Sequence, residues 1–177
     1  PGGRAGRMPH DPAPRPGTPG TGGTAFYPSL PPGPSHDVPT PYGEPSAPIT
    51  IGEIAGRRVA FLPRHGVDHR FPPHAINYRA NLWALRAVGV RQILSPCAVG
   101  SLKPEHGPGT IVVPDQIVDR TWGRAHTIYE AEGPVVHVGF ADPYCPNGRQ
   151  VAVDAARLSE LQVVSDGTLV VINGPRF

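Results

Sequence analysis

Long apolar runs are absent from this sequence of 177 residues. A helix that crosses a bilayer needs about 20 consecutive apolar residues, and no stretch comes near that length. Arginines occur near the first residue, but no apolar stretch follows them, so the pattern of a secretory signal peptide is missing. These absences argue against insertion into a membrane and against secretion.

Cysteine is scarce, and neither basic nor acidic residues are in large excess. The two cysteines, Cys97 and Cys145, are too few for a disulfide framework, and they suit a reducing cytoplasm. The 16 basic and 14 acidic residues leave a formal charge of only +2. This balance argues against nucleic acid as a partner. We therefore expect a cytoplasmic protein that binds neither nucleic acid nor a membrane.

Proline and glycine are plentiful but unevenly distributed. Residues 1–49 hold 14 of the 25 prolines and 9 of the 22 glycines. Residues 1–21 offer almost nothing to bury, so we expect a disordered tail there. The composition of residues 50–177 is that of a globular domain, and we expect residues 22–177 to form part of one domain.

The hydrophobic pattern predicts an α/β fold. Two short strands at 50–53 and 58–62 are expected to form a hairpin. Apolar residues recur at helical spacing over 76–88, and Gly89 is well placed to end that helix. A helix between strands is typical of a sheet with helices on its faces. The other expected elements are strands at 90–94, 111–113, 135–138 and 168–172 and a helix at 151–161.

Two loops carry residues that suit anion binding. Arg64 and His65 follow a predicted strand, and a guanidinium beside an imidazole offers several donors to an oxyanion. Small residues at 97–101 follow another predicted strand, where backbone N–H groups can approach a ligand. Each motif alone is better explained as an ordinary loop. Both lie at carboxyl ends of strands, where α/β proteins bind ligands, and this raises the odds of a site.

Other kinds of site find little support in the sequence. His65 and His69 are four residues apart, but Gly66 between them argues against a helical pair of metal ligands. Thr24 follows two glycines and is a weak candidate for a phosphate loop, with a piece of the disordered tail as the alternative. No nucleophile stands next to a base. We therefore expect no metal site.

Several longer motifs are similar to those of one enzyme family. Their order and spacing resemble the trimeric 5′-methylthioadenosine and purine nucleoside phosphorylases, from about residue 41 to residue 177. Several motifs of this length are far more specific together than any short pattern. The motifs lie at 61–66, 76–81, 98–102, 114–116, 119–121, 141–146 and 174–177.

The resemblance implies roles for individual residues. Inorganic phosphate would be bound by Thr24, Arg64, His65, Cys97 and Ala98. The nucleoside would be bound by Ala98 and Phe177, with His137 reaching the active site of a neighbouring subunit. Cys97 replaces the hydroxyl residue common in the family, and a thiol is a poorer donor. The backbone would therefore carry more of that contact.

The resemblance also implies a reaction. Phosphate attacks C1′ of the ribosyl ring while the purine leaves, with no cofactor beyond phosphate as co-substrate. The expected nucleoside is 5′-methylthioadenosine, and the alternative is a 6-oxopurine nucleoside such as inosine or guanosine. The implied assembly is a homotrimer, and the implied role is purine salvage.

The resemblance covers only the first part of the family's chain. The Asp or Asn that protonates the purine lies later in the family, so the catalytic acid is unknown here. We expect a chain truncated at the carboxyl end, with an incomplete mixed central sheet flanked by helices. A catalytically inactive remnant is the second alternative.

Overall fold

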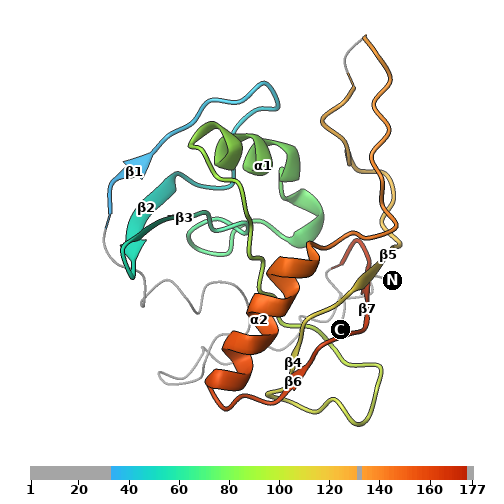
Figure 1. The fold of residues 1–177 in the computed structure, drawn as a ribbon. Helices are drawn as coiled ribbons and strands as arrows, with labels where there is room; N and C mark the ends of the chain where they lie inside the picture. Colours follow the sequence, from blue (N-terminus) through green and yellow to red (C-terminus); the bar gives the residue numbers. More distant parts are fainter. Residues whose placement is uncertain (1–32, 131–132, 175–177) are drawn as a thin grey trace, which may run out of the picture.

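The computed structural model describes residues 33–130 and 133–174 (Figure 1). The predictions for the tail at 1–21, for Thr24 and for Phe177 lie outside these residues. Within the described residues no helix has the length and apolar character that a membrane span requires. The α/β class with an incomplete mixed sheet is confirmed, and the strands are divided among three small sheets, one antiparallel and two parallel.

The predicted hairpin is present and forms the centre of the antiparallel sheet. Strand β2 (Ile49–Ile54) pairs with β3 (Arg57–Phe61), and the short β1 (Ser35–His36) pairs with the other edge of β2. The two-residue turn has positive φ at both Ala55 and Gly56. This turn geometry matches the twist of antiparallel strands and so fixes their register.

Helix α1 (Tyr78–Ala87) confirms the predicted helix and its end. Asn77 caps the first turn by accepting a hydrogen bond from the Ala80 N–H. Gly89, at φ +92°, donates to the Arg86 carbonyl, and the next N–H donates to the Leu85 carbonyl. This pair of bonds satisfies carbonyls that a helix end leaves unpaired, and it requires a left-handed residue that glycine supplies.

Two asparagines bind the segment at residues 42–46 to α1 through hydrogen bonds. The side-chain amide of Asn77 donates to the Tyr42 carbonyl at 2.7 Å. Asn81 is buried; its Oδ1 accepts from the Ser46 N–H at 2.8 Å and its amide donates to the Ser46 hydroxyl at 2.9 Å. The buried apolar residues of this segment, β2 and α1 are mostly alanines. They are Ala47, Ile49, Ile76, Ala80 and Ala84.

Two parallel strand pairs are connected through the second helix. Strand β4 (Ile111–Val112) pairs with β6 (Val163–Val164), and β5 (Gln116–Asp119) pairs with β7 (Thr168–Val171). Helix α2 (Pro146–Leu158) connects the first strand of each pair to the second and runs beside β4 and β6 (Figure 1). It begins five residues before the predicted start because Pro146 suits a first helical position and Cys145 caps it.

Two predicted strands are not formed. The segments 90–94 and 135–138 are extended or irregular, and Leu94 and Val135 are 85% and 81% exposed. A strand of β-prone residues needs a neighbour to complete its hydrogen bonds. No other described strand pairs with either segment. The strand predictions at 90–94 and 135–138 are therefore wrong for this structure.

Arg149 on α2 joins the ends of β4 and β6. Its guanidinium donates to the Pro114 carbonyl at 2.8 Å and to the Ser165 carbonyl. We expect Arg149→Ala to lower the free energy of unfolding by about 1.5 kcal/mol, because it leaves the half-buried Pro114 carbonyl without this donor. Urea unfolding measures this loss. Arg157→Ala on the same helix is the matched control, because Arg157 is exposed with only a 4.0 Å contact to Asp154. Equal stability of the two variants would contradict this role.

Candidate functional site

The predicted Arg64–His65 motif lies directly after β3. Pro63 and Gly66 are buried, while Arg64 and His65 are half-buried. The Gly66 N–H donates to the Pro63 carbonyl at 2.9 Å, and Gly66 has a φ of +79°. This tight turn holds the arginine and the histidine at the carboxyl end of the strand. Their backbone is therefore fixed before any ligand arrives.

Arg64 contacts the second predicted loop. Its Nη1 donates to the Pro96 carbonyl at 3.2 Å, across 32 residues of sequence. Cys97 and Ala98 follow immediately and are exposed. The structure thus brings the two predicted parts of the anion site together, with the exposed residues Cys97 and Ala98 directly after the carbonyl that Arg64 contacts.

His65 has a defined ring orientation. Its Nδ1 lies 2.9 Å from the Phe71 carbonyl oxygen, and the Phe71 N–H donates to the His65 carbonyl at 3.0 Å. A carbonyl can only accept, so Nδ1 carries the proton. The other nitrogen, Nε2, is left for a ligand.

Tyr144 adjoins the same turn, and sequence reasoning did not select it. Burial, followed by the charge that Cys97 carries when it is ionised, raises the pKa of the Tyr144 phenol above its ordinary value. The phenol is therefore neutral near pH 7 and remains a hydrogen-bond donor. No local pattern around residue 144 predicts this, because both the burial of Tyr144 and the nearness of Cys97 are set by the folded chain.

The remaining predicted residues are not brought to this place. His137 is exposed in the segment 133–140. Among the described residues it makes no hydrogen bond to Arg64, His65 or the turn at 97–98. Its predicted reach to a neighbouring subunit stays a prediction. Within the described residues no three His, Cys, Asp or Glu side chains gather as a metal site would require.

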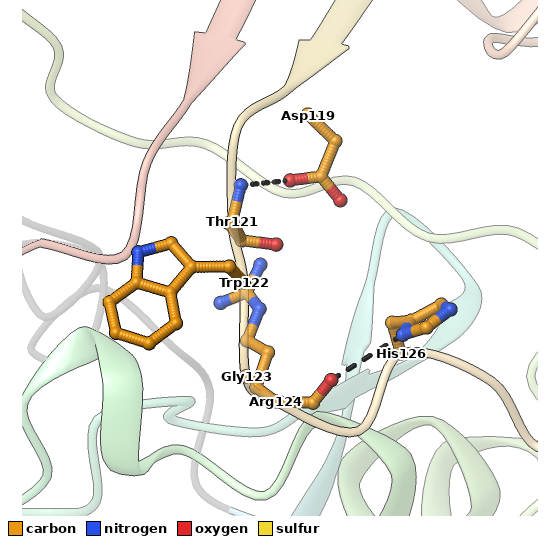
Figure 2. A pocket seen from close by; sticks show the side chains of 6 residues that line it. All are labelled: Asp119, Thr121, Trp122, Gly123, Arg124 and His126. Carbon is orange, nitrogen blue, oxygen red and sulfur yellow. Dashed lines mark hydrogen bonds between the residues drawn. The ribbon is translucent and has the colours of Figure 1, made fainter.

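An open hollow of about 280 Å³ lies elsewhere, after β5 (Figure 2). Hydrogen bonds from Thr121 and, more weakly, the charges of Arg124 and His126 lower the pKa of the Asp119 carboxyl. Asp119 is therefore ionised at neutral pH and would repel a phosphate dianion. None of the predicted phosphate residues lines this hollow, so we do not assign the anion site to it. Its lining residues are Asp119, Thr121, Trp122, Gly123, Arg124 and His126.

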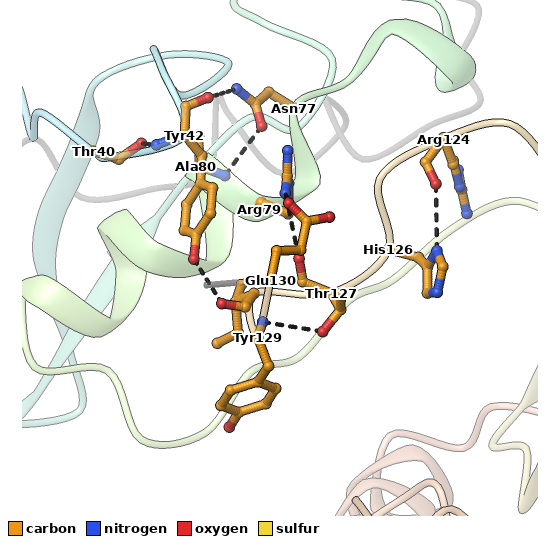
Figure 3. Close-up of polar contacts among 11 residues, drawn as sticks. Thr40, Tyr42, Asn77, Arg79, Ala80, Arg124, His126, Thr127, Tyr129 and Glu130 are labelled. Atoms are coloured by element: carbon orange, nitrogen blue, oxygen red, sulfur yellow. Dashed lines mark hydrogen bonds and ion pairs between the residues drawn. The ribbon is translucent and has the colours of Figure 1, made fainter. Parts of the chain in front are cut away.

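The chain after this hollow is attached to α1 (Figure 3). Arg79 forms an ion pair with Glu130, and its guanidinium carbon lies 4.8 Å from the centre of the Tyr42 ring. The Tyr42 hydroxyl donates to the Ile128 carbonyl at 2.8 Å. These contacts join three separate parts of the chain and fix the start of the segment that leads to His137.

Comparison with known proteins places this chain in a family. A model of the phosphorylase superfamily matches residues 28–177. A purine nucleoside phosphorylase of Streptomyces coelicolor is 59% identical over 88% of this chain and 58% of its own length. An S-methyl-5′-thioadenosine phosphorylase of Mycolicibacterium smegmatis is 60% identical over 79% of this chain and 51% of its own.

Solved structures agree. The methylthioadenosine phosphorylase of Schistosoma mansoni, in its apo form, superposes with a TM-score of 0.80 at 36% identity. The alignment covers 84% of this chain and 60% of the solved one. This chain therefore spans about half to three fifths of the length of the relatives it matches. Because the family model covers most of it, the chain belongs to the phosphorylase superfamily.

Proposed function

We propose that this protein catalyses the phosphorolysis of purine nucleosides, with 5′-methylthioadenosine as the preferred substrate. The products are the free purine and the 1-phosphate of the (methylthio)ribose. The observation that carries the proposal is the contact of Arg64 with the Pro96 carbonyl, which places a guanidinium beside the exposed turn at 97–98. The names of relatives that are 59% and 60% identical support the nucleoside class.

In this proposal Arg64 and His65 bind the phosphate dianion and hold it in line with C1′. The C1′–N bond breaks as the C1′–O bond forms, and the electron pair of the broken bond leaves with the purine. The transition state resembles a ribosyl cation, which the adjacent dianion stabilises. Donors that are already held in place contribute most to this stabilisation, because they need not reorient during the reaction. The residue that protonates the purine is not assigned.

The other parts of the proposal follow from the resemblance. Phosphate binds through Arg64, His65, Cys97 and Ala98, with Thr24 as a further ligand. Ala98 and Phe177 contact the nucleoside, and His137 contributes to the site of a neighbouring subunit in a homotrimer. The reaction needs no metal or organic cofactor, and it takes place in the cytoplasm.

A phosphorolysis assay on the full chain tests the proposal. We expect purine release from 5′-methylthioadenosine to depend on phosphate, because phosphate is the nucleophile. The release is measured with and without phosphate, and inosine is assayed in parallel. Release at the same rate without phosphate would indicate a hydrolase and contradict the proposal. Faster turnover of inosine would favour the 6-oxopurine alternative, which the name of the Streptomyces coelicolor relative supports. Phosphate binding without turnover would favour the inactive alternative.

A further inference from the structure

The loop after Gly66 folds back over His65. The His69 N–H donates to the Gly66 carbonyl at 3.4 Å, and Phe71 closes the loop through its two bonds to His65. As a result the imidazoles of His65 and His69 stack, with centroids 5.0 Å apart and planes inclined by 10°. The His69 ring therefore covers one face of the ring that we assign to phosphate.

This arrangement restricts the ways in which His65 can meet an anion. Its Nδ1 is occupied by the Phe71 carbonyl, and one face is occupied by His69. The free polar atom is Nε2, which donates a hydrogen bond only when the ring is an imidazolium. Phosphate would therefore select the charged form of His65.

An imidazolium at His65 sets a requirement on the stacked ring. Two stacked cations repel each other, whereas a neutral aromatic face stabilises a cation above it.

Other cations and acids are also close to His65 along the chain. Arg64 precedes His65, Arg70 lies against Gly66 and over the Phe71 ring, Asp68 is exposed on the loop, and Cys97 adjoins Arg64 through Pro96.

The backbone at His69 is also unusual. Its φ is +53°, in the left-handed region that glycine adopts at lower cost. Because this conformation costs energy, the presence of a large ring there points to a role for the ring itself. Here the left-handed turn directs the ring back along the loop onto His65.

We propose that His69 is a positioning residue: its neutral ring supports the His65 imidazolium and aims the Nε2–H at the anion. This inference rests on the proposed function, in which His65 binds phosphate. It adds a residue that the sequence reasoning considered only as a metal ligand and set aside. The role requires a flat uncharged ring at residue 69 and no hydrogen bond from it.

Calorimetric titration of the full chain with inorganic phosphate tests the inference with three variants. His69→Ala removes the ring, and we expect an affinity lower by about 5-fold, the upper end of the range for a cation–π contact at an exposed residue. His69→Phe keeps a flat neutral ring and should bind within about 2-fold of the wild type. His69→Gly relaxes the left-handed backbone, yet it should lose as much affinity as His69→Ala.

The outcomes distinguish a failure of the positioning role of His69 from a failure of the proposed function. Wild-type affinity in both His69→Ala and His69→Gly would overturn the positioning role, as would a His69→Phe variant as weak as His69→Ala. If the wild type takes up no phosphate, the proposed function fails, and ¹⁵N NMR of the imidazoles then decides the positioning role by itself. We expect the Nδ1–H form of neutral His65 in the wild type and in His69→Phe, and a mixture of both forms in His69→Ala. The same form in all three would overturn the role.

Discussion

Replacing Arg64 with alanine is expected to lower the affinity for inorganic phosphate by about 100-fold, or about 2.7 kcal/mol. Arg64 is half-buried, and its backbone is held by the turn at Gly66, so little ordering is needed when an anion binds. Its loss removes a charged donor from the turn at 97–98. Calorimetry with phosphate on the full chain measures the effect.

Two further variants control this experiment. Arg57→Ala removes the same charge from the opposite end of β3, and we expect it to change phosphate affinity by less than about 2-fold. Arg64→Gln keeps a donor for the Pro96 carbonyl without the charge, and we expect it to bind nearly as weakly as Arg64→Ala. Unchanged affinity in Arg64→Ala would remove the residue from the site, and equal losses in Arg57→Ala would indicate a general effect of net charge.

Replacing Asn81 with alanine is expected to lower the free energy of unfolding by about 3 kcal/mol. Asn81 and Ser46 are 5% and 2% exposed, so water cannot replace the two hydrogen bonds that the amide makes. The variant leaves the Ser46 N–H and hydroxyl buried without partners and also opens a small cavity. Urea unfolding followed by circular dichroism measures the change.

The neighbouring position supplies the matched control. Leu82 is on the same helix and 50% exposed, so Leu82→Ala should cost less than about 1 kcal/mol. If Asn81→Ala were no more destabilising than Leu82→Ala, the two amide hydrogen bonds would not be the link that holds the segment before β2 on α1.

Local sequence signals predicted the elements whose hydrogen bonds join residues that are close in sequence. The end of α1 is one example, because Gly89 and the next residue donate to carbonyls only three and five residues earlier in the chain. The hairpin turn at Ala55 and Gly56 is another. Such bonds depend on a few adjacent residues, and their residue types are visible in sequence. The failed strand at 90–94 shows the limit, because pairing depends on a partner elsewhere in the chain.

The candidate site was predictable in part for the same reason. The rule that ligands lie at the carboxyl ends of strands holds for Arg64, which follows β3, but residues 97–101 were selected by it although the strand expected before them is not formed. It did not predict that the Pro96 carbonyl receives the guanidinium, since that contact spans 32 residues. The stack of His65 on His69 depends on positive φ at Gly66 and His69, and a positive φ is uncommon for residues other than glycine, although histidine adopts it more often than most. Tyr144 depends on burial, which only the folded chain defines.

The exposed thiol of Cys97 offers a reporter for the anion site. It follows Pro96, whose carbonyl receives the Arg64 guanidinium, so phosphate bound there would slow the reaction of this thiol with a labelling reagent. Cys145 is also exposed and would compete for the label. Its sulfur caps α2 by accepting from the Gly148 N–H, and serine caps helices in the same way. A chain with serine at residue 145 therefore leaves a single labelling position beside the guanidinium.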